Sequence, residues 1–481
     1  MQEILKAALD AAGAAGASFA EARFVQRKSE VHEVKNGKPA RAALSADRGL
    51  GVRVIVDGCW GFAAISDVTR TATAVKTAKL AVKIARASGL APSGEPVALA
   101  PGNPGHGEYR TPIERDPFKV HIEDKLGLLL EAEKLLQGPE LGVTQAFMTL
   151  VRKSTWFANS EGTSFDQEIT ESGAGLAATA VRDGEFQVRS YPNSFRGNFA
   201  TAGFEYVEGL ELAANAERVS AEARQLLDAP QLPPGRRDVI LDGGQLALQV
   251  HESIGHPIEL DRVYGTEAAF AGTSFLTTEK LEGFRYGSEH VNVVADATVP
   301  LGLGTFGFDD EGTPAGCVDI IRGGEFKGYI SDRESAARLG VESSGAARAM
   351  SWNCIPIVRM TNINLLPGNW KFEDLLADTD GGVYMATNRS WSIDDRRLNF
   401  QFGTEAAWEI RGGRLGRMYK NPTYTGITPE FWNSCDAVCS RDYWSMWGTP
   451  NCGKGQPGQS AHVGHGTAPA RFRGVQVGVV K

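Results

Sequence analysis

The feature that most constrains this chain is a break near its middle, where residues 229–235 read APQLPPG. Two adjacent prolines before a glycine interrupt any helix or strand and are typical of a linker. With 481 residues, the chain is also longer than one hydrophobic core usually organises. We therefore predict an N-terminal domain over residues 1–229 and a C-terminal domain over residues 236–481.

The first half of the chain shows both helical and strand patterns. Apolar residues recur at helical spacing over residues 2–15, and residues 19–25 and 30–34 have the pattern of strands. Alternating valines precede Asp57-Gly58, a pair that tolerates the positive φ of a hairpin turn. Three further helices are predicted over residues 66–88 (capped by Ser66 and Asp67), 123–136 and 207–227. Strands are predicted between the last two of these helices.

The second half begins with a short predicted strand at 238–241 and a helix at 243–255. The remainder is rich in glycine, threonine and short apolar runs, which is typical of β structure. The sequence therefore predicts an α+β protein. Its N-terminal domain is α/β, with an antiparallel sheet and long helices, and its C-terminal domain is mainly antiparallel β and carries the helix at 243–255.

Charge and hydropathy exclude several classes of protein. The net charge of -8 argues against a protein that mainly binds nucleic acid, because phosphate binding needs a basic surface. No apolar run is long enough to span a membrane, and Glu3 and Asp10 interrupt the apolar pattern expected of a signal peptide. We expect a cytoplasmic protein with no nucleic-acid or membrane partner. Six cysteines are too few for a disulfide scaffold, and Cys435 and Cys439 are interpreted as free thiols.

The helix after the linker ends in the motif HESIGH, residues 251–256. A zinc hydrolase needs two neutral imidazoles on one metal ion and a carboxylate beside the water that the metal activates. His251 and His256 are candidates for the imidazoles. Glu252 is placed to take the proton of that water and pass it to the leaving amine.

The spacing of the two histidines differs from that of the common H-E-x-x-H motif, in which they lie four residues apart on one helical face. Here they lie five residues apart, which is about 140° round an ideal helix at about 100° per residue. A π-type turn closes this gap, and such turns are frequent at functional sites. Gly255 and Pro257 are compatible with a distorted helix end. We therefore predict a π-bulge or a broken helix between His251 and His256.

A metal site of this kind needs a third ligand, for which the residues alone leave several candidates. Glu259 and Asp261 lie close in the sequence, and PNCGKGQPGQSAHVGHG near the C-terminus adds Cys452, His462 and His465. A thiolate in a glycine-rich turn suits zinc, and the neighbouring Lys454 would lower the pKa of the thiol. Spacing does not decide between Cys452 and His462.

The motif HESIGHPIELD, followed much later by NCGKGQ, resembles the TldD/PmbA family, whose members have been described as modulators of DNA gyrase. Other stretches resemble the family too and lie in the same order along almost the whole chain: GLGVRVIVDGCWGFA, FANSEGTS, FDDEGTPAG, GYISDRESAARLG and TNINLLPG. Because both histidines, the glutamate and the later cysteine are present, the chain resembles the metal-binding, TldD-like branch.

The resemblance implies specific roles and a specific activity. His251, His256 and Cys452 would be Zn²⁺ ligands and Glu252 the general base or acid. The reaction would be hydrolysis of leader peptides and of small or unfolded peptides inside an enclosed chamber. A PmbA/TldE-like partner subunit, in a heterodimer, or a second copy of the chain, in a homodimer, would complete the chamber. Binding of an extended peptide through its backbone would explain broad specificity.

Two segments depart from the family pattern. Residues 386–402, ATNRSWSIDDRRLNFQF, carry Arg389, Trp391, Arg396 and Arg397 where the resemblance predicts a glycine-rich stretch. Residues 431–447 are unusually aromatic, with Phe431, Trp432, Tyr443, Trp444 and Trp447. Either segment could line the chamber, pack in the core or contact a partner. The acidic residues of FDDEGTPAG, Asp309 to Glu311, are interpreted as a capped turn rather than as a metal site.

Two other classes of function compete with a peptidase. One is a non-catalytic regulator that binds another protein such as DNA gyrase, against which the acidic charge and the intact motif both argue. The other is a metal-dependent enzyme recruited to the biosynthesis of a small molecule or a peptide natural product. Binding of a partner on size exclusion without proteolysis, in the presence of zinc, would favour the regulator. Mass spectrometry of peptide and metabolite mixtures separates the recruited enzyme from a peptidase.

Overall fold

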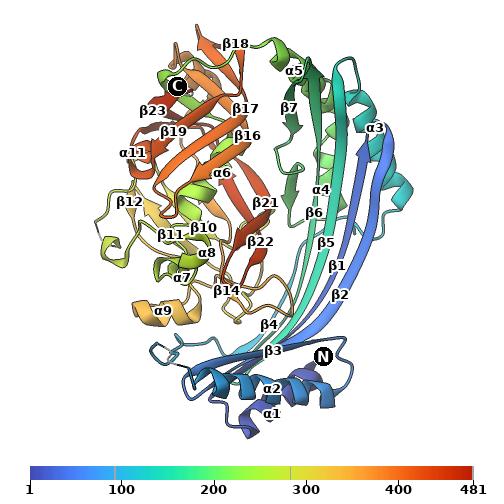
Figure 1. Cartoon of the computed structure of the whole chain (residues 1–481), viewed down its shortest axis with the longest axis vertical. Helices are drawn as coiled ribbons and strands as arrows, with labels where there is room; N and C mark the ends of the chain where they lie inside the picture. Colours follow the sequence, from blue (N-terminus) through green and yellow to red (C-terminus); the bar gives the residue numbers. More distant parts are fainter. Residues whose placement is uncertain (92–93, 282, 479–481) are drawn as a thin grey trace.

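The structure is a computed structural model that describes residues 1–91, 94–281 and 283–478 (Figure 1). The last three residues of the predicted C-terminal domain, 236–481, lie outside the described residues. As predicted, the fold is α+β and its sheets are largely antiparallel. The described residues include no helix that is both long and apolar enough to cross a membrane.

The first half of the chain builds one long, curved sheet that lies along the second half (Figure 1). Its strand order is β3-β2-β1-β5-β6-β4, and β7 and β8 also pair with β6. Within residues 1–91 and 94–229, only the β4–β6 pairing is parallel. The strands are β1 Phe19–Lys35, β2 Lys38–Val56, β3 Cys59–Ser66, β4 Gly105–Arg110, β5 Leu141–Asn159, β6 Thr163–Arg182, β7 Glu185–Tyr191 and β8 Asn198–Ala200.

Strand β1 covers both of the strands predicted at 19–25 and 30–34, together with the polar residues between them. It pairs with β2 along its whole length and with β5 along almost all of it. Because backbone hydrogen bonds on both sides do not depend on side-chain polarity, the polar stretch continues the strand. The predicted hairpin at Asp57-Gly58 joins β2 to β3, with positive φ at both residues.

Five helices accompany this sheet: α1 Gln2–Ala14, α2 Thr71–Ser88, α3 Ile122–Leu136, α4 Phe204–Gly209 and α5 Leu212–Asp228. Helices α1 and α2 pack near β2 and β3 at one end, and α3 and α5 pack on β5 and β6 at the other. These two clusters of buried apolar residues are separate, so the sheet spans two small cores.

Two helix predictions were wrong in detail. Helix α2 begins at Thr71 with Arg70 as its N-cap, because Ser66, the predicted cap, is still the last residue of β3. The helix predicted over 207–227 is two helices, α4 and α5, separated at Leu210 and Glu211. Glu211 has a φ of 49°, which no residue inside an α-helix adopts.

The second half of the chain is centred on a ring of strands. Pairings run β16-β9-β23-β19-β17, and a further pairing of β17 with β16 closes the ring; β18 and β20 extend it. Among the strands of the ring that the structure describes, only β9 and β16 run parallel. These strands are β9 Gly235–Leu241, β16 Val383–Ile393, β17 Asn399–Arg411, β18 Arg414–Lys420, β19 Thr423–Ile427, β20 Cys435–Val438 and β23 Ala470–Val477.

Smaller elements surround this ring. The short strands are β10 Val293–Asp296, β11 Cys317–Arg322, β12 Glu325–Phe326, β13 Ala347–Arg348, β14 Ile357–Val358, β15 Ile363–Leu365, β21 Ser445–Lys454 and β22 Gln459–Thr467. The helices are α6 Gly243–Val250, η1 His251–Gly255, α7 Leu260–Val263, α8 Ala268–Ala271, η2 Thr278–Lys280, α9 Arg333–Leu339, α10 Phe372–Ala377, α11 Thr428–Asn433 and η3 Arg441–Tyr443. Strands β21 and β22 form a hairpin of their own.

The proline-rich segment at 229–235 lies where the chain passes from the first sheet to this ring. Pro230 accepts a backbone hydrogen bond from Lys420, and Leu232 is buried in the core of the second half. The segment is therefore packed against the C-terminal half. The predicted domain boundaries, 1–229 and 236–481, stay a prediction.

Candidate metal centre

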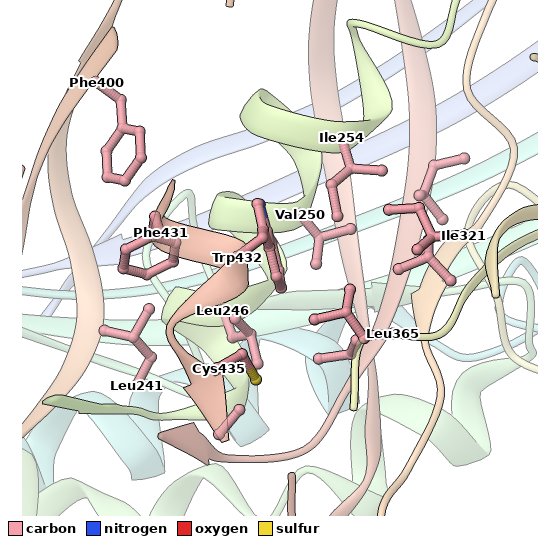
Figure 2. Packing of buried hydrophobic residues seen from close by; sticks show 14 of the residues in the cluster. Leu241, Leu246, Val250, Ile254, Ile321, Leu365, Phe400, Phe431, Trp432 and Cys435 are labelled. Carbon is pink, nitrogen blue, oxygen red and sulfur yellow. The ribbon is translucent and has the colours of Figure 1, made fainter. Parts of the chain in front are cut away.

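The helix that carries HESIGH is held in the core of the second half by one apolar face. Leu246, Val250 and Ile254 follow one another at four-residue spacing and are fully buried. Figure 2 shows them along this helix, with Trp432 beside them. Burial of three such side chains stabilises the helix position by several kcal/mol, at about 1.5–3 kcal/mol each.

The predicted distortion between the two histidines is confirmed. After α6 the helix widens into one π turn, η1, in which the amide of His256 donates to the carbonyl of His251 at 3.1 Å. This bond spans five residues instead of four. The turn brings the rings of His251 and His256 to 4.9 Å, centroid to centroid, with their planes at 87°.

Hydrogen bonds to Ser253 secure the π turn from the core side. The Ser253 hydroxyl donates to the Gln249 carbonyl at 2.6 Å and accepts from the Trp432 indole at 2.9 Å. The Tyr286 hydroxyl donates to the Ser253 carbonyl. Gly255 is required here because a Cβ would lie 2.2 Å from the sulfur of the buried Met360.

Strand β21 brings Cys452 to the two histidines from about 200 residues further along the chain. One ligand atom from each of His251, His256 and Cys452 lies within 4.8 Å of the others. The Cys452 sulfur is 3.7 Å from Nε2 of His256. All three residues are buried, with exposed fractions of 3–4%. The three predicted ligands therefore converge, although their role as ligands stays a prediction.

The hydrogen bonds of His251 leave one of its nitrogens free for a metal. Nδ1 of His251 lies 2.8 Å from Nε2 of His465, and Nδ1 of His465 lies 3.2 Å from the carbonyl of Ile363. Burial lowers the pKa of His465 well below its usual value, so this ring is neutral. The single proton of His465 is therefore on Nδ1, which donates to the carbonyl of Ile363. Nε2 of His465 then accepts from Nδ1 of His251. As a result, Nε2 of His251 keeps a lone pair.

A carboxylate orients His256 in the same way. Nδ1 of His256 donates to Glu259 at 2.9 Å, which leaves its Nε2 free. The buried ammonium of Lys454 lies 3.5 Å from Glu259 and donates to Asp261 at 2.5 Å. Glu259 and Asp261, two of the candidates for the third ligand, thus belong to a buried ionic network behind His256.

The ionisation of these groups fits a metal that binds imidazole and thiolate. Burial lowers the pKa of His251 and lowers that of His256 further, which keeps both rings neutral. Burial alone would raise the pKa of the Cys452 thiol, but the positive charge of Arg359 opposes this effect and the pKa falls below its usual value. Two neutral imidazoles and one thiolate are a donor set that zinc and similar soft-leaning metals take.

Comparison with known proteins agrees with this geometry. Residues 234–478 match the PmbA/TldA metallopeptidase C-terminal domain, and residues 20–85 and 115–227 match domain 1 and the central domain of the same family. The chain belongs to the PmbA/TldD family of metallopeptidases. The predicted resemblance is confirmed.

Relatives match from about half to nearly all of the chain. A metalloprotease of Methanocaldococcus jannaschii is 31% identical over 450 residues, 93% of this chain and 94% of the relative. A zinc metalloprotease TldD homologue of Saccharolobus solfataricus is 26% identical over 246 residues, 51% of this chain and 52% of the relative. The structure of TldE from Thermococcus kodakarensis superposes with a TM-score of 0.73 at 16% identity, covering 98% of this chain and 99% of the other. That last likeness shows the fold alone.

The general base predicted for this metallopeptidase, Glu252, lies in the π turn and is 5% exposed. Its carboxylate forms an ion pair with Arg397. Arg397 lies in the segment 386–402, which the sequence marks as unusual without indicating the partner of Arg397. The sequence did not predict two supporting residues, because only tertiary contacts connect them to the site. Arg359 donates to the Cys452 carbonyl at 2.5 Å, and His465 supports His251.

The other candidate residues lie outside the cluster. His462 pairs with Glu171 of β6 at 2.6 Å. Phe431 and Trp432 are buried in the core, which accounts for part of the aromatic segment by packing. Cys435 and Cys439 are buried free thiols, as predicted.

The acidic residues Asp309 to Glu311 have structural partners. Asp309 accepts from the amides of Glu311 and Thr313, as in a capped turn, and Glu311 pairs with Arg53 of β2 at 2.6 Å. The interpretation as a structural turn fits these contacts.

Proposed function

We propose that this metallopeptidase is a zinc-dependent enzyme that hydrolyses small, unfolded or leader peptides inside an enclosed chamber. His251, His256 and Cys452 would hold the zinc ion, and Glu252 would move the proton. The observation that carries the proposal is the convergence of these three ligand atoms within 4.8 Å, beside a buried carboxylate.

Zinc is the metal we favour because two imidazoles and one thiolate match the three-ligand sites of zinc enzymes. The Saccharolobus solfataricus relative is named a zinc metalloprotease, which supports the same choice. When bound, such an ion polarises the substrate carbonyl and lowers the pKa of water. Supporting bonds from His465 and Glu259 hold the two rings with Nε2 free, which prepares the chain for the ion.

Glu252 is the group that can carry the proton. It follows His251 directly, so the π turn that aims the imidazole also fixes the carboxylate. In the proposed reaction, Glu252 accepts a proton from the attacking water and returns it to the nitrogen of the leaving amine. Low exposure excludes bulk water, which would otherwise compete for these transfers.

Cavities between the two halves of the chain support the proposed peptide-binding space. A cavity of about 270 Å³ lies between the first sheet and the β21–β22 hairpin, and its lining includes Lys153, Glu171, Arg348 and His462. A neighbouring cavity of about 530 Å³ shares Glu171 and His462 with it. The charged lining and the hairpin suit a peptide bound in extended form.

We propose that a second subunit completes the chamber. This subunit is either a PmbA/TldE-like chain or another copy of this chain. The proposed ligand residues are only 3–4% exposed. The assembly must therefore open to admit a peptide to these residues and then enclose it. A cytoplasmic location stays a prediction.

The substitution Glu252→Gln tests the proposed role of Glu252. The amide keeps the size of the side chain but cannot accept the proton, so hydrolysis should fall by about 10²–10⁴-fold while the metal content stays unchanged. Mass spectrometry of digests of an unfolded peptide mixture measures the activity, with and without a partner subunit.

Glu289→Gln is the matched control, because Glu289 is exposed and distant from HESIGH in the sequence. Its activity should equal that of the wild type. Hydrolysis by Glu252→Gln within a few-fold of the wild-type rate would remove Glu252 from the mechanism.

A further inference from the structure

The ion pair between Arg397 and Glu252 places a cation directly on the proposed general base. Arg397 lies in the turn between β16 and β17, and Glu252 lies in η1, so the contact joins two separate parts of the C-terminal half. The Arg397 side chain is 14% exposed and that of Glu252 is 7% exposed. The ligands are more deeply buried, so the guanidinium lies on the more open side of the site.

The turn that presents Arg397 is strongly preorganised from within. Both oxygens of Asp394 accept backbone hydrogen bonds, Oδ1 from Arg396 and Leu398 and Oδ2 from Asn399. The amide of Arg397 donates to the Asp394 carbonyl at 2.9 Å. Arg397 itself has a φ of 63°, a conformation that costs a non-glycine residue energy and persists only where its surroundings hold it.

Neighbouring segments also hold this turn from outside. The amides of Thr273 and Phe275 donate to the carbonyls of Asp395 and Arg396, each at 2.9 Å. The hydroxyl of Thr428 donates to the carbonyl of Arg397 at 2.9 Å. Gly272 allows this close approach, because a Cβ there would lie 2.3 Å from the Asp395 carbonyl oxygen. A backbone fixed from both sides aims one side chain at Glu252.

The guanidinium keeps donors that the described residues do not use. Among those residues its side chain donates one hydrogen bond, to Glu252, and its buried Nε–H has no acceptor. A buried donor without a partner costs about 1–3 kcal/mol, so such a group calls for an acceptor. Arginine offers five N–H donors, so it can bind a second oxygen.

We propose that Arg397 binds the carbonyl oxygen of the peptide bond that is cleaved and stabilises the negative charge that forms on it. The inference rests on the proposed peptidase function. The contact with Glu252 is then kept during the reaction, and the donors of the guanidinium that Glu252 does not use bind the substrate oxygen. A guanidinium fixed before the substrate arrives stabilises such a charge without reorganisation.

Water, Glu252 and the peptide bond supply every atom and electron pair of this step. The oxygen of water bonds to the carbonyl carbon, its proton moves to Glu252, and the electron pair of the C=O π bond moves to the oxygen beside Arg397. The pair then returns, the C–N bond breaks, and the proton on Glu252 moves to the amine nitrogen.

The position of Arg397 favours this oxygen over the C-terminal carboxylate of a peptide. An arginine that touches the general base lies beside the bond being broken, because the base must reach both the attacking water and the leaving nitrogen. The C-terminal carboxylate lies at least one residue further along the substrate. An arginine that bound the C-terminal carboxylate would therefore lie further from Glu252 than Arg397 does.

Arg397→Ala, Arg397→Lys and the control Arg396→Ala test the proposal on the full-length, zinc-loaded enzyme. Arg396 is the exposed neighbour and keeps its backbone bond in the control. We expect Arg397→Ala to lower kcat by about 10²–10³-fold with KM within a few-fold, as for other groups that stabilise an oxyanion. Added guanidinium should restore part of the rate, and Arg396→Ala should match the wild type.

A second readout does not depend on turnover. Affinity for a phosphinate peptide, whose anionic oxygens stand in for the charged oxygen, should fall about 10²-fold in Arg397→Ala by calorimetry. Affinity for the unreactive product peptide should stay within a few-fold. Zinc content and the thermal unfolding midpoint show whether a variant has folded. If Arg397→Ala has not folded, Arg397→Lys, which keeps the charge, replaces it in both measurements.

Three results would overturn the proposal. Values of kcat and KM for Arg397→Ala that both stay within three-fold of wild type would make the ion pair structural. A raised KM with unchanged kcat would make Arg397 an anchor for the C-terminal carboxylate. Failure of the wild-type enzyme, with its partner, to cleave any peptide would instead remove the proposed function on which the inference rests.

Discussion

At the scale of single residues, the candidate metal centre depends on which nitrogen of each histidine carries a proton. The contact of His251 with His465 and that of His256 with Glu259 both engage Nδ1. The two Nε2 atoms are therefore left for a metal. In this arrangement a histidine and a carboxylate outside the proposed ligand set would fix the tautomers of the two histidines that are proposed to bind the metal.

The substitution His465→Ala tests this arrangement. Loss of the acceptor frees the His251 ring to rotate and to change tautomer, so metal affinity should fall about 10–100-fold. Titration of the metal-free protein with zinc against a competing chelator measures the affinity. His462→Ala is the matched control, since His462 pairs with Glu171 instead, and an equal loss in both variants would contradict the account.

Some residues of this site can be predicted from the sequence, and others cannot. His251, Glu252 and His256 are adjacent in sequence, so their spacing is enough to predict both the site and the π turn. Cys452 lies on strand β21, far from the motif in sequence, and spacing alone did not decide between Cys452 and His462; the family resemblance was needed to favour Cys452. Arg397 and His465 join the site only through tertiary contacts, which no local pattern encodes.

At the scale of elements, the position of α6 determines where the motif lies. Asp242 caps this helix by accepting from the amide of Gln245 at 2.7 Å, and Leu246 and Val250 anchor it in the core. Burial raises the pKa of Asp242 to about 6, although backbone hydrogen bonds from the first turn oppose this effect. The contribution of this cap to the free energy of unfolding therefore depends on pH.

Asp242→Asn should remove this dependence while keeping a capping oxygen. Because the folded-state pKa is above the unfolded value of about 3.9, the contribution to stability is complete below pH 4 and is lost as the pH rises through 6. The free energy of unfolding of wild type, relative to the variant, should thus fall between pH 4 and 7. Since Asp242 is only partly buried, we expect about 1–3 kcal/mol.

Urea unfolding of both proteins at several pH values measures this difference. Comparison with the variant cancels the titration of the other buried carboxylates. A difference between the two proteins that does not change with pH would show that Asp242 ionises normally in the folded state.

Most elements were predicted from local patterns, and the exceptions have physical causes. The hairpin at Asp57-Gly58 and the helix at 2–15 follow turn chemistry and apolar spacing, which are local. The single long β1 and the break between α4 and α5 depend on pairing partners and on the backbone at Glu211. Neither can be read from the periodicity of the segment concerned.

At the scale of the whole molecule, the two halves are connected by buried ion pairs. Arg53 of β2 contacts Glu311 at 2.6 Å, and Arg189 of β7 contacts Glu405 of β17 at 3.1 Å. Breaking such a buried pair typically costs about 3–5 kcal/mol, so the first sheet and the ring are held in a defined relation. This relation forms the cavities beside the β21–β22 hairpin, and the sequence predicted the two halves but not their contact.

The most direct test of the account is the metal content of the purified protein by mass spectrometry, with His251→Ala and Cys452→Ser beside the wild type. His290→Ala is the control, because His290 is exposed. We predict about one zinc per chain in the wild type and the control, none in His251→Ala and strongly reduced zinc in Cys452→Ser. Equal zinc in His251→Ala, or none in the wild type after zinc is supplied, would contradict the metal centre.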